Sequence, residues 1–101
     1  MTPEAKTKQR VRRVLDLHKV YHFTPTGAGY GRAGIPDIVA CVNGRFLAIE
    51  CKAGRGKTTA LQDRELQRIR DAGGTAMVIY DTEDDYARLL AGLQHMLQIP
   101  R

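Results

Sequence analysis

The residues most able to do chemistry are two carboxylates at the outer ends of two apolar runs. Asp37 precedes the first run, Glu50 lies near the end of the second, and Asn43-Gly44 separates them. An Asn-Gly dipeptide between apolar runs predicts a two-residue β-hairpin turn, because both positions then need positive φ. In that register Val42 faces Arg45. Counting outward in pairs places Asp37 opposite Glu50, with Cβ atoms roughly 4.5–5.5 Å apart.

Two carboxylates that face each other repel unless a positive group lies between them. A hard cation such as Mg²⁺ is held by one or two carboxylates together with water and substrate phosphate. Lys52 follows Glu50 by two residues, so strand alternation places its ammonium group on the same face. Two interpretations stay open for these three residues. One is a metal-dependent site, and the other is a solvated strand end where Lys52 pairs with the acids.

The elements that must position these residues predict one α/β (α+β) domain over residues 1–101. We expect a helix from Pro3 to about Lys19, a strand near 21–24, the two hairpin strands, a helix at about 60–72, a strand at 75–80 and a last helix that ends before Pro100. Both hairpin strands are apolar on both faces, which is typical of a sheet covered by helices on both sides. A right-handed crossover makes the strand at 75–80 parallel to the second hairpin strand. The prediction is therefore a central mixed sheet flanked by helices.

Composition limits the class of protein and its partners. The chain has 101 residues, of which 43% are hydrophobic and 27% charged, as is usual for globular domains. Its net charge of +5 favours polyanionic partners. No apolar run approaches the roughly 18 residues of a membrane span, and no signal peptide is evident, so we expect a cytoplasmic protein without membrane contact. Cys41 and Cys51 fall on opposite faces of the hairpin and are predicted to be unbridged, buried hydrophobes.

Two further polar residues have both a structural and a functional interpretation. Glu4 lies in the first turn of the first helix, on the side that faces the core. It is either an acid favoured by the helix dipole or a group at the mouth of the acidic site. Gln62 completes a capping-box pattern that begins at Thr59, so its amide either caps the helix or orients a water beside the carboxylates.

Four cationic residues are candidates for contacts with phosphate groups. They are Lys8 on the first helix, Arg32 in the glycine-rich segment before the hairpin, and Arg55 and Lys57 directly after Lys52. Each could also be a solvated surface residue. A nucleotide-binding P-loop is a rival interpretation of Gly56-Lys57-Thr58, but a P-loop needs glycine at the position of Cys51. A basic loop near phosphates is the better interpretation.

Taken together, these residues resemble the PD-(D/E)XK nuclease superfamily, and within it the virus-type replication-repair nuclease (VRR-NUC) domain. The resemblance rests on Pro36-Asp37, on Glu50-Cys51-Lys52 and on Gln62, in the order α-β-β-β-α-β. That order is the restriction-endonuclease-like αβββαβ core. Further matching positions are Glu4, Thr26-Gly27, Gly34-Ile35, Ala53 and Ala72-Gly73-Gly74.

The resemblance implies an endodeoxyribonuclease that uses Mg²⁺ or Mn²⁺ to hydrolyse phosphodiester bonds. Asp37, Glu50 and the backbone carbonyl of Cys51 would hold the metal. Glu4 would be a ligand directly or through water. Lys52 would position the nucleophile or neutralise developing charge, and Gln62 would orient the water or Lys52.

The resemblance also implies partners. The chain resembles the stand-alone viral VRR-NUC proteins, which are compact homodimers. They act on branched DNA such as Holliday junctions, in replication, repair or recombination. The expected partners are therefore branched DNA and a second copy of the chain, in the host cytoplasm if the protein is phage-encoded. The last helix, from Tyr86 to Leu97, is either a dimer surface or part of the core. The alternative function is a non-catalytic, basic nucleic-acid-binding module with a structural acidic cluster.

Overall fold

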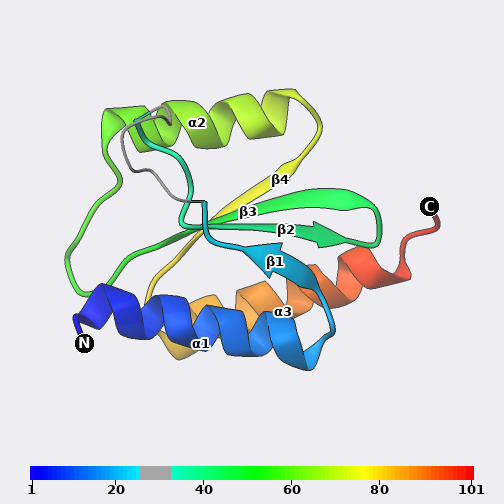
Figure 1. The fold of residues 1–101 in the computed structure, drawn as a ribbon, viewed down its shortest axis with the longest axis horizontal. Coiled ribbons are helices and arrows are strands. Elements are labelled where there is room, and N and C mark those ends of the chain that lie inside the picture. The colour runs from blue at the N-terminus through cyan, green and yellow to red at the C-terminus, as the bar shows by residue number, and fades with distance from the viewer. Residues whose placement is uncertain (26–32) are drawn as a thin grey trace.

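The computed structural model describes residues 1–25 and 33–101, which form a mixed sheet covered by helices. In chain order the elements are α1 (Pro3–Leu17), β1 (Tyr21–Phe23), β2 (Ile38–Val42), β3 (Arg45–Cys51), α2 (Ala60–Asp71), β4 (Thr75–Ile79) and α3 (Glu83–Gln98). The strands lie in the order β1-β2-β3-β4, and only the β3–β4 pair is parallel. Figure 1 shows α2 on one face of the sheet and α1 and α3 on the other. The predicted αβββαβ core is confirmed. The proposed roles of Thr26-Gly27 and Arg32 lie outside the described residues.

The β2–β3 hairpin has the predicted register. Asn43 and Gly44 form its turn with φ values of 54° and 80°, as the Asn-Gly signal requires. Val42 pairs with Arg45, and the pairing continues to Ile38 and Ile49. The Asn43 amide also donates hydrogen bonds of 3.0 Å and 2.6 Å to carbonyl groups of Met96 and Ile99, so the turn is joined to the end of α3.

Side-chain caps begin the helices at the predicted residues. The hydroxyl of Thr2 accepts from Ala5 N, and that of Thr82 accepts from Asp85 N. α1 ends at Leu17, two residues before the predicted end, because Lys19 takes a left-handed conformation with φ of 57°. The remaining helix and strand bounds agree with the predictions to within one or two residues.

The main core lies between the sheet and the α1/α3 layer. Arg10 holds these two helices together, because its guanidinium group lies 3.7 Å from the ring centroid of Tyr86 and contacts both carboxylate oxygens of Glu83 at 2.9 Å and 3.1 Å. Fully buried aliphatic side chains fill the space between the layers: Val11, Leu15, Ile38, Leu47, Ile49, Ile79, Leu89 and Leu93. The buried side of α3 is therefore part of the core, which is one of the two roles expected for this helix.

The opposite face of the sheet is only partly covered, which corrects one prediction. Cys41 is exposed and Phe46 is 47% exposed, because α2 does not reach across the whole hairpin. The prediction that Cys41 is buried was wrong, whereas Cys51 is buried and both thiols are free, as expected. On α2, the apolar residue Leu61 is exposed, whereas the charged residue Glu65 is buried. None of the helices in the described part of the chain is long and apolar enough to cross a membrane.

Candidate active site

Asp37 and Glu50 meet where the predicted register places them. Asp37 directly precedes β2, and Glu50 is the penultimate residue of β3, one position beyond the Ile38–Ile49 pair. The two carboxyl groups lie close enough for each to affect the pKa of the other. Asp37 Oδ2 also accepts a 2.8 Å hydrogen bond from the backbone N–H of Cys51. Glu50 is only 1% exposed, so the acidic pair is largely removed from water.

Burial and the proximity of the two carboxyl groups separate their pKa values. Burial, followed by the hydrogen bond to Asp37 and the charge of Asp37, raises the pKa of Glu50 to about 9. Burial would also raise the pKa of Asp37, but hydrogen bonds from Glu50, Cys51 N–H and Lys8 outweigh it and lower that pKa. At neutral pH the two carboxyl groups together therefore carry one proton and one negative charge.

Lys8 of α1 contacts this negative charge. Its Nζ lies 3.2 Å from Asp37 Oδ1, the oxygen that does not accept from Cys51. Lys8 and Asp37 line a cleft of about 320 Å³ together with Thr24-Pro25 and residues 33–36. Lys8, which was predicted to contact substrate phosphate, thus forms an ion pair with Asp37 in the structure.

Lys52 lies at the same end of β3 and is 7% exposed. Its positive charge acts to lower the pKa of Glu50, against the larger effect of burial. Its backbone is fixed on both sides: Lys52 N–H donates to Ile79 O at 2.9 Å, and Lys52 O accepts from the Thr7 hydroxyl at 3.1 Å. The predicted grouping of Asp37, Glu50 and Lys52 is thus present.

Thr7 was missed in the sequence. It is fully buried in α1, and its hydroxyl lies 3.3 Å from Pro3 O as well as 3.1 Å from Lys52 O. A signal was present, because Thr7 precedes the buried Val11 by four residues and therefore lies on the apolar face of the helix. A hydroxyl at such a position needs a partner inside the protein.

Glu4 lies near the acidic pair but does not complete a ligand cluster. Its charge contributes to the raised pKa of Glu50, which places it close enough to interact. Within residues 1–25 and 33–101, however, no three His, Cys, Asp or Glu side chains converge as a metal site. The described geometry brings together Asp37 and Glu50, and Glu4 remains outside that pair.

Gln62 has the capping role that its sequence pattern allows. Its Oε1 accepts from Thr59 N at 2.9 Å, and its own backbone N–H donates to the Thr59 hydroxyl at 3.2 Å. Gly34 packs against this helix start with a φ of 84°. A Cβ at Gly34 would lie 2.5 Å from carbonyl atoms of Leu61 and 2.8 Å from Gln62 N. The segment that leads to Asp37 therefore lies directly against the first turn of α2.

The basic loop between β3 and α2 presents Arg55 and Lys57 to solvent. The Tyr80 hydroxyl donates to Gly56 O at 2.6 Å, and Gly56 N–H donates to Ala53 O at 3.0 Å. A P-loop directs its backbone N–H groups toward phosphate, whereas the Gly56 N–H is bonded within the loop. The geometry therefore favours a basic surface loop over a nucleotide cradle.

The donor atoms of the acidic pair suit a hard divalent cation. Glu50 Oε2 is buried and has no hydrogen-bond partner among the described residues, and Asp37 Oδ1 already contacts a cation in the form of the Lys8 ammonium group. The Cys51 thiol is a poor ligand, because burial, then the charges of Asp37 and Glu50, raise its pKa to about 12. The role of the Cys51 carbonyl stays a prediction.

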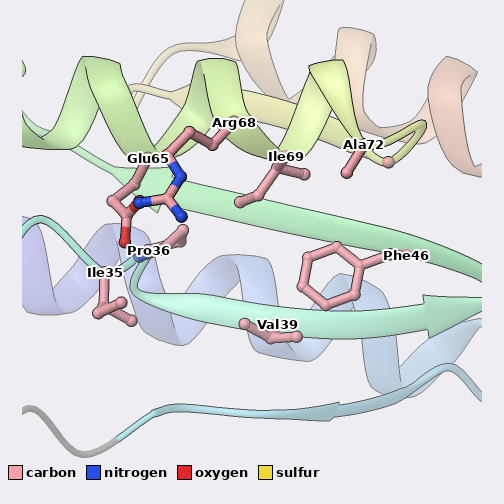
Figure 2. A pocket seen from close by; sticks show the side chains of 9 residues that line it. Ile35, Pro36, Val39, Phe46, Glu65, Arg68, Ile69 and Ala72 are labelled. Carbon is pink, nitrogen blue, oxygen red and sulfur yellow. The ribbon is translucent and has the colours of Figure 1, made fainter. Parts of the chain in front are cut away.

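A larger hollow of about 500 Å³ lies elsewhere, between α2 and the hairpin. Figure 2 shows Val39 and Phe46 on the strand side and Ile69 on the helix side. Glu65 and Arg68, which form a 3.6 Å ion pair, also line it. Its lining includes neither Asp37 nor Lys52, so this hollow is distinct from the acidic site.

The fold and the acidic pair define a nuclease domain of the PD-(D/E)XK superfamily. Residues 19–90 match the family described as archaeal Holliday junction resolvase (Hjc), and the chain belongs to this family. A solved structure named "VRR_NUC domain protein" has the same fold, with a TM-score of 0.73 and 19% identity over 94% of this chain and 90% of that one. The predicted superfamily and fold are therefore confirmed.

One curated relative also carries a nuclease name. "Putative nuclease p44" of Acyrthosiphon pisum secondary endosymbiont phage 1 is 42% identical over 55 residues. The match covers 54% of this chain and 58% of the relative, so the chain corresponds to little more than half of that protein's length.

Proposed function

We propose that the chain is a divalent-metal-dependent endonuclease that hydrolyses phosphodiester bonds of branched DNA, such as a Holliday junction. The observation that carries this proposal is the Asp37–Glu50 pair beside the ends of β2 and β3, in which Glu50 Oε2 is buried and has no hydrogen-bond partner among the described residues. Membership of the Holliday junction resolvase family supports the choice of substrate.

In this proposal each side chain has a defined task. Asp37, Glu50 and the backbone carbonyl of Cys51 would hold Mg²⁺ or Mn²⁺, and Glu4 would be a ligand directly or through water. A metal bound there would stabilise charge on the phosphate and lower the pKa of the attacking water. Glu50 would bind the metal in its ionised form. Lys52, whose backbone is fixed by Thr7, neutralises negative charge that develops at the phosphate.

Other predicted residues contribute binding and orientation. Gln62, held at the start of α2, would orient the attacking water or the Lys52 ammonium group. Lys8, Arg32, Arg55 and Lys57 would contact DNA phosphates, in keeping with the net charge of +5.

We also propose a homodimer that acts in the cytoplasm, which is that of the host if the protein is phage-encoded. The match to a phage protein supports this location. The exposed parts of α3 at Leu90 and Leu97 are available for contact with a second copy, because they lie outside the core.

The test is a cleavage assay on four-way junction, flap and duplex DNA with Mg²⁺, Mn²⁺ or EDTA. We expect metal-dependent cleavage of the junction by the wild type and a loss of at least about 100-fold in Lys52→Ala. Arg64→Ala is a matched control, since it removes one exposed charge from α2. Equal cleavage by the wild type and Lys52→Ala would contradict the proposal. Junction binding without cleavage by the wild type would support the non-catalytic binding module instead.

A further inference from the structure

We infer that Lys8 is an internal cation that occupies the metal-facing oxygen of Asp37 and is displaced to a DNA phosphate when a divalent cation binds. This inference rests on the proposed metal site and adds a mechanism that couples metal loading to substrate contact. It concerns the contact of 3.2 Å between Lys8 Nζ and Asp37 Oδ1.

The first step of the argument is that the two oxygens of Asp37 have different partners. Oδ2 accepts from the backbone N–H of Cys51 at 2.8 Å, so it is fixed on the strand. Oδ1 is the oxygen left for an ion, and the Lys8 ammonium group lies against it. A metal ion that binds Oδ1 must therefore compete with Lys8 for the same oxygen.

The second step is that Lys8 can leave this position at small cost. Its side chain is 30% exposed, and it lines an open cleft of about 320 Å³ beside Asp37. A long lysine side chain at such a depth can turn its ammonium group toward solvent while α1 stays in place. Two cations at one carboxylate repel each other, so binding of a divalent ion would drive this turn.

The third step is where the displaced charge goes. Lys8 follows Glu4 by four residues on α1, so both side chains project from one side of the helix. The cleft that Lys8 lines is also lined by Asp37, so a phosphate that enters it would approach the proposed metal site. The released ammonium group is thus already beside the anion that the site receives.

Metal titration in the absence of DNA tests the competition. We expect Lys8→Met to bind Mn²⁺ about five- to tenfold more tightly than the wild type, by calorimetry at constant ionic strength. Lys6→Met is the matched control, because it removes an equal but exposed charge from the same helix. Lys8→Arg keeps the ion pair and should bind Mn²⁺ within about twofold of the wild type.

Two results would overturn the inference. Weaker or equal Mn²⁺ binding by folded Lys8→Met means that the ammonium group supports Asp37 rather than competing for it. Absence of Mn²⁺ binding by the wild type overturns the proposed metal site and this inference together. The first result leaves the proposed function standing, so the two failures are distinguishable.

Salt dependence of junction binding tests the destination of Lys8. In buffer with Ca²⁺, we compare the slope of the logarithm of the junction-binding constant against the logarithm of the salt concentration. This slope should be smaller in magnitude by about 0.9 for Lys8→Met than for the wild type. In EDTA, the two slopes should agree, because Lys8 then pairs with Asp37. The same difference in both conditions would show that Lys8 contacts phosphate without displacement, and the inference would fail.

Discussion

Asp37 Oδ2 accepts its hydrogen bond from Cys51 N–H, and Cys51 is the residue directly after Glu50. One backbone group thus fixes the first carboxylate in relation to the strand that carries the second. Since the bond uses only one oxygen, the other remains directed toward Lys8 and the cleft. The Asp37 carboxylate therefore has one oxygen that is fixed by the backbone and one oxygen that faces Lys8 and the cleft.

This division predicts different effects for two substitutions of Asp37. Asp37→Asn keeps an oxygen for Cys51 N–H, so it should fold with nearly wild-type stability but lose Mn²⁺ binding and cleavage. Asp37→Ala leaves that N–H without its partner and should also lose about 1–3 kcal/mol in the free energy of unfolding. Urea unfolding and calorimetry measure the two effects. Wild-type Mn²⁺ affinity in Asp37→Asn would contradict the assigned ligand.

The raised pKa of Glu50 predicts how stability depends on pH without metal. Between its ordinary pKa of 4.5 and its folded pKa of about 9, the folded chain holds one more proton than the unfolded chain. The free energy of unfolding should therefore fall as pH rises, by up to about 1.4 kcal/mol per pH unit from this group. The contribution is fully present below pH 4.5 and is lost as pH passes through about 9.

Glu50→Gln is the control for this dependence, because it keeps the shape of the protonated acid and cannot ionise. Urea unfolding in EDTA at several pH values from 6 to about 8.5 should show a flatter profile for the variant than for the wild type. Identical slopes would mean that another group causes the dependence.

Thr7 should matter through its hydroxyl group alone. Thr7→Val keeps the branched shape but leaves Lys52 O without its 3.1 Å donor, so we expect a loss of about 1–2 kcal/mol in the free energy of unfolding and a slower cleavage step. Thr7→Ser retains the hydroxyl and should stay closer to the wild type in cleavage rate. Single-turnover cleavage with saturating Mg²⁺ measures this difference. Equal rates for the valine and serine variants would show that the hydrogen bond does not position Lys52.

Gly34 and Gly44 form a matched pair for a test of the loop before Asp37. Both have positive φ, 84° and 80°, but only Gly34 has neighbours where a Cβ would be. Gly44→Ala should cost about 1 kcal/mol from backbone strain. Gly34→Ala should cost about 1–3 kcal/mol more, because its Cβ would meet the start of α2, and cleavage should fall as Asp37 shifts. Thermal unfolding of both variants makes the comparison, and equal costs would contradict the close packing.

Local sequence signals predicted the parts of the structure that local chemistry determines. Asn43-Gly44 determined the hairpin register because few other dipeptides favour two successive positive φ values. That register alone placed Asp37 opposite Glu50. The caps at Thr2, Thr59 and Thr82 likewise begin their helices as expected, because each hydroxyl bonds within its own first turn.

Contacts between distant elements could not be predicted in this way. The Lys8–Asp37 and Thr7–Lys52 contacts depend on how α1 crosses the ends of the strands, which no local pattern specifies. The exposure of Cys41 depends on how far α2 extends over the hairpin. Apolar character therefore predicted which residues could be buried, but the lengths and positions of the helices decided which ones are.

The position of β3 inside the sheet has a consequence for inactivation. Because β2 and β4 flank it, the β3 backbone pairs with β2 from Arg45 to Ile49 and with β4 from Leu47 to Cys51. Amide hydrogens in such a strand exchange with solvent only in openings that approach complete unfolding. Heating should therefore leave cleavage intact until the whole domain melts, and the amides of β3 should be among the last in the protein to take up deuterium.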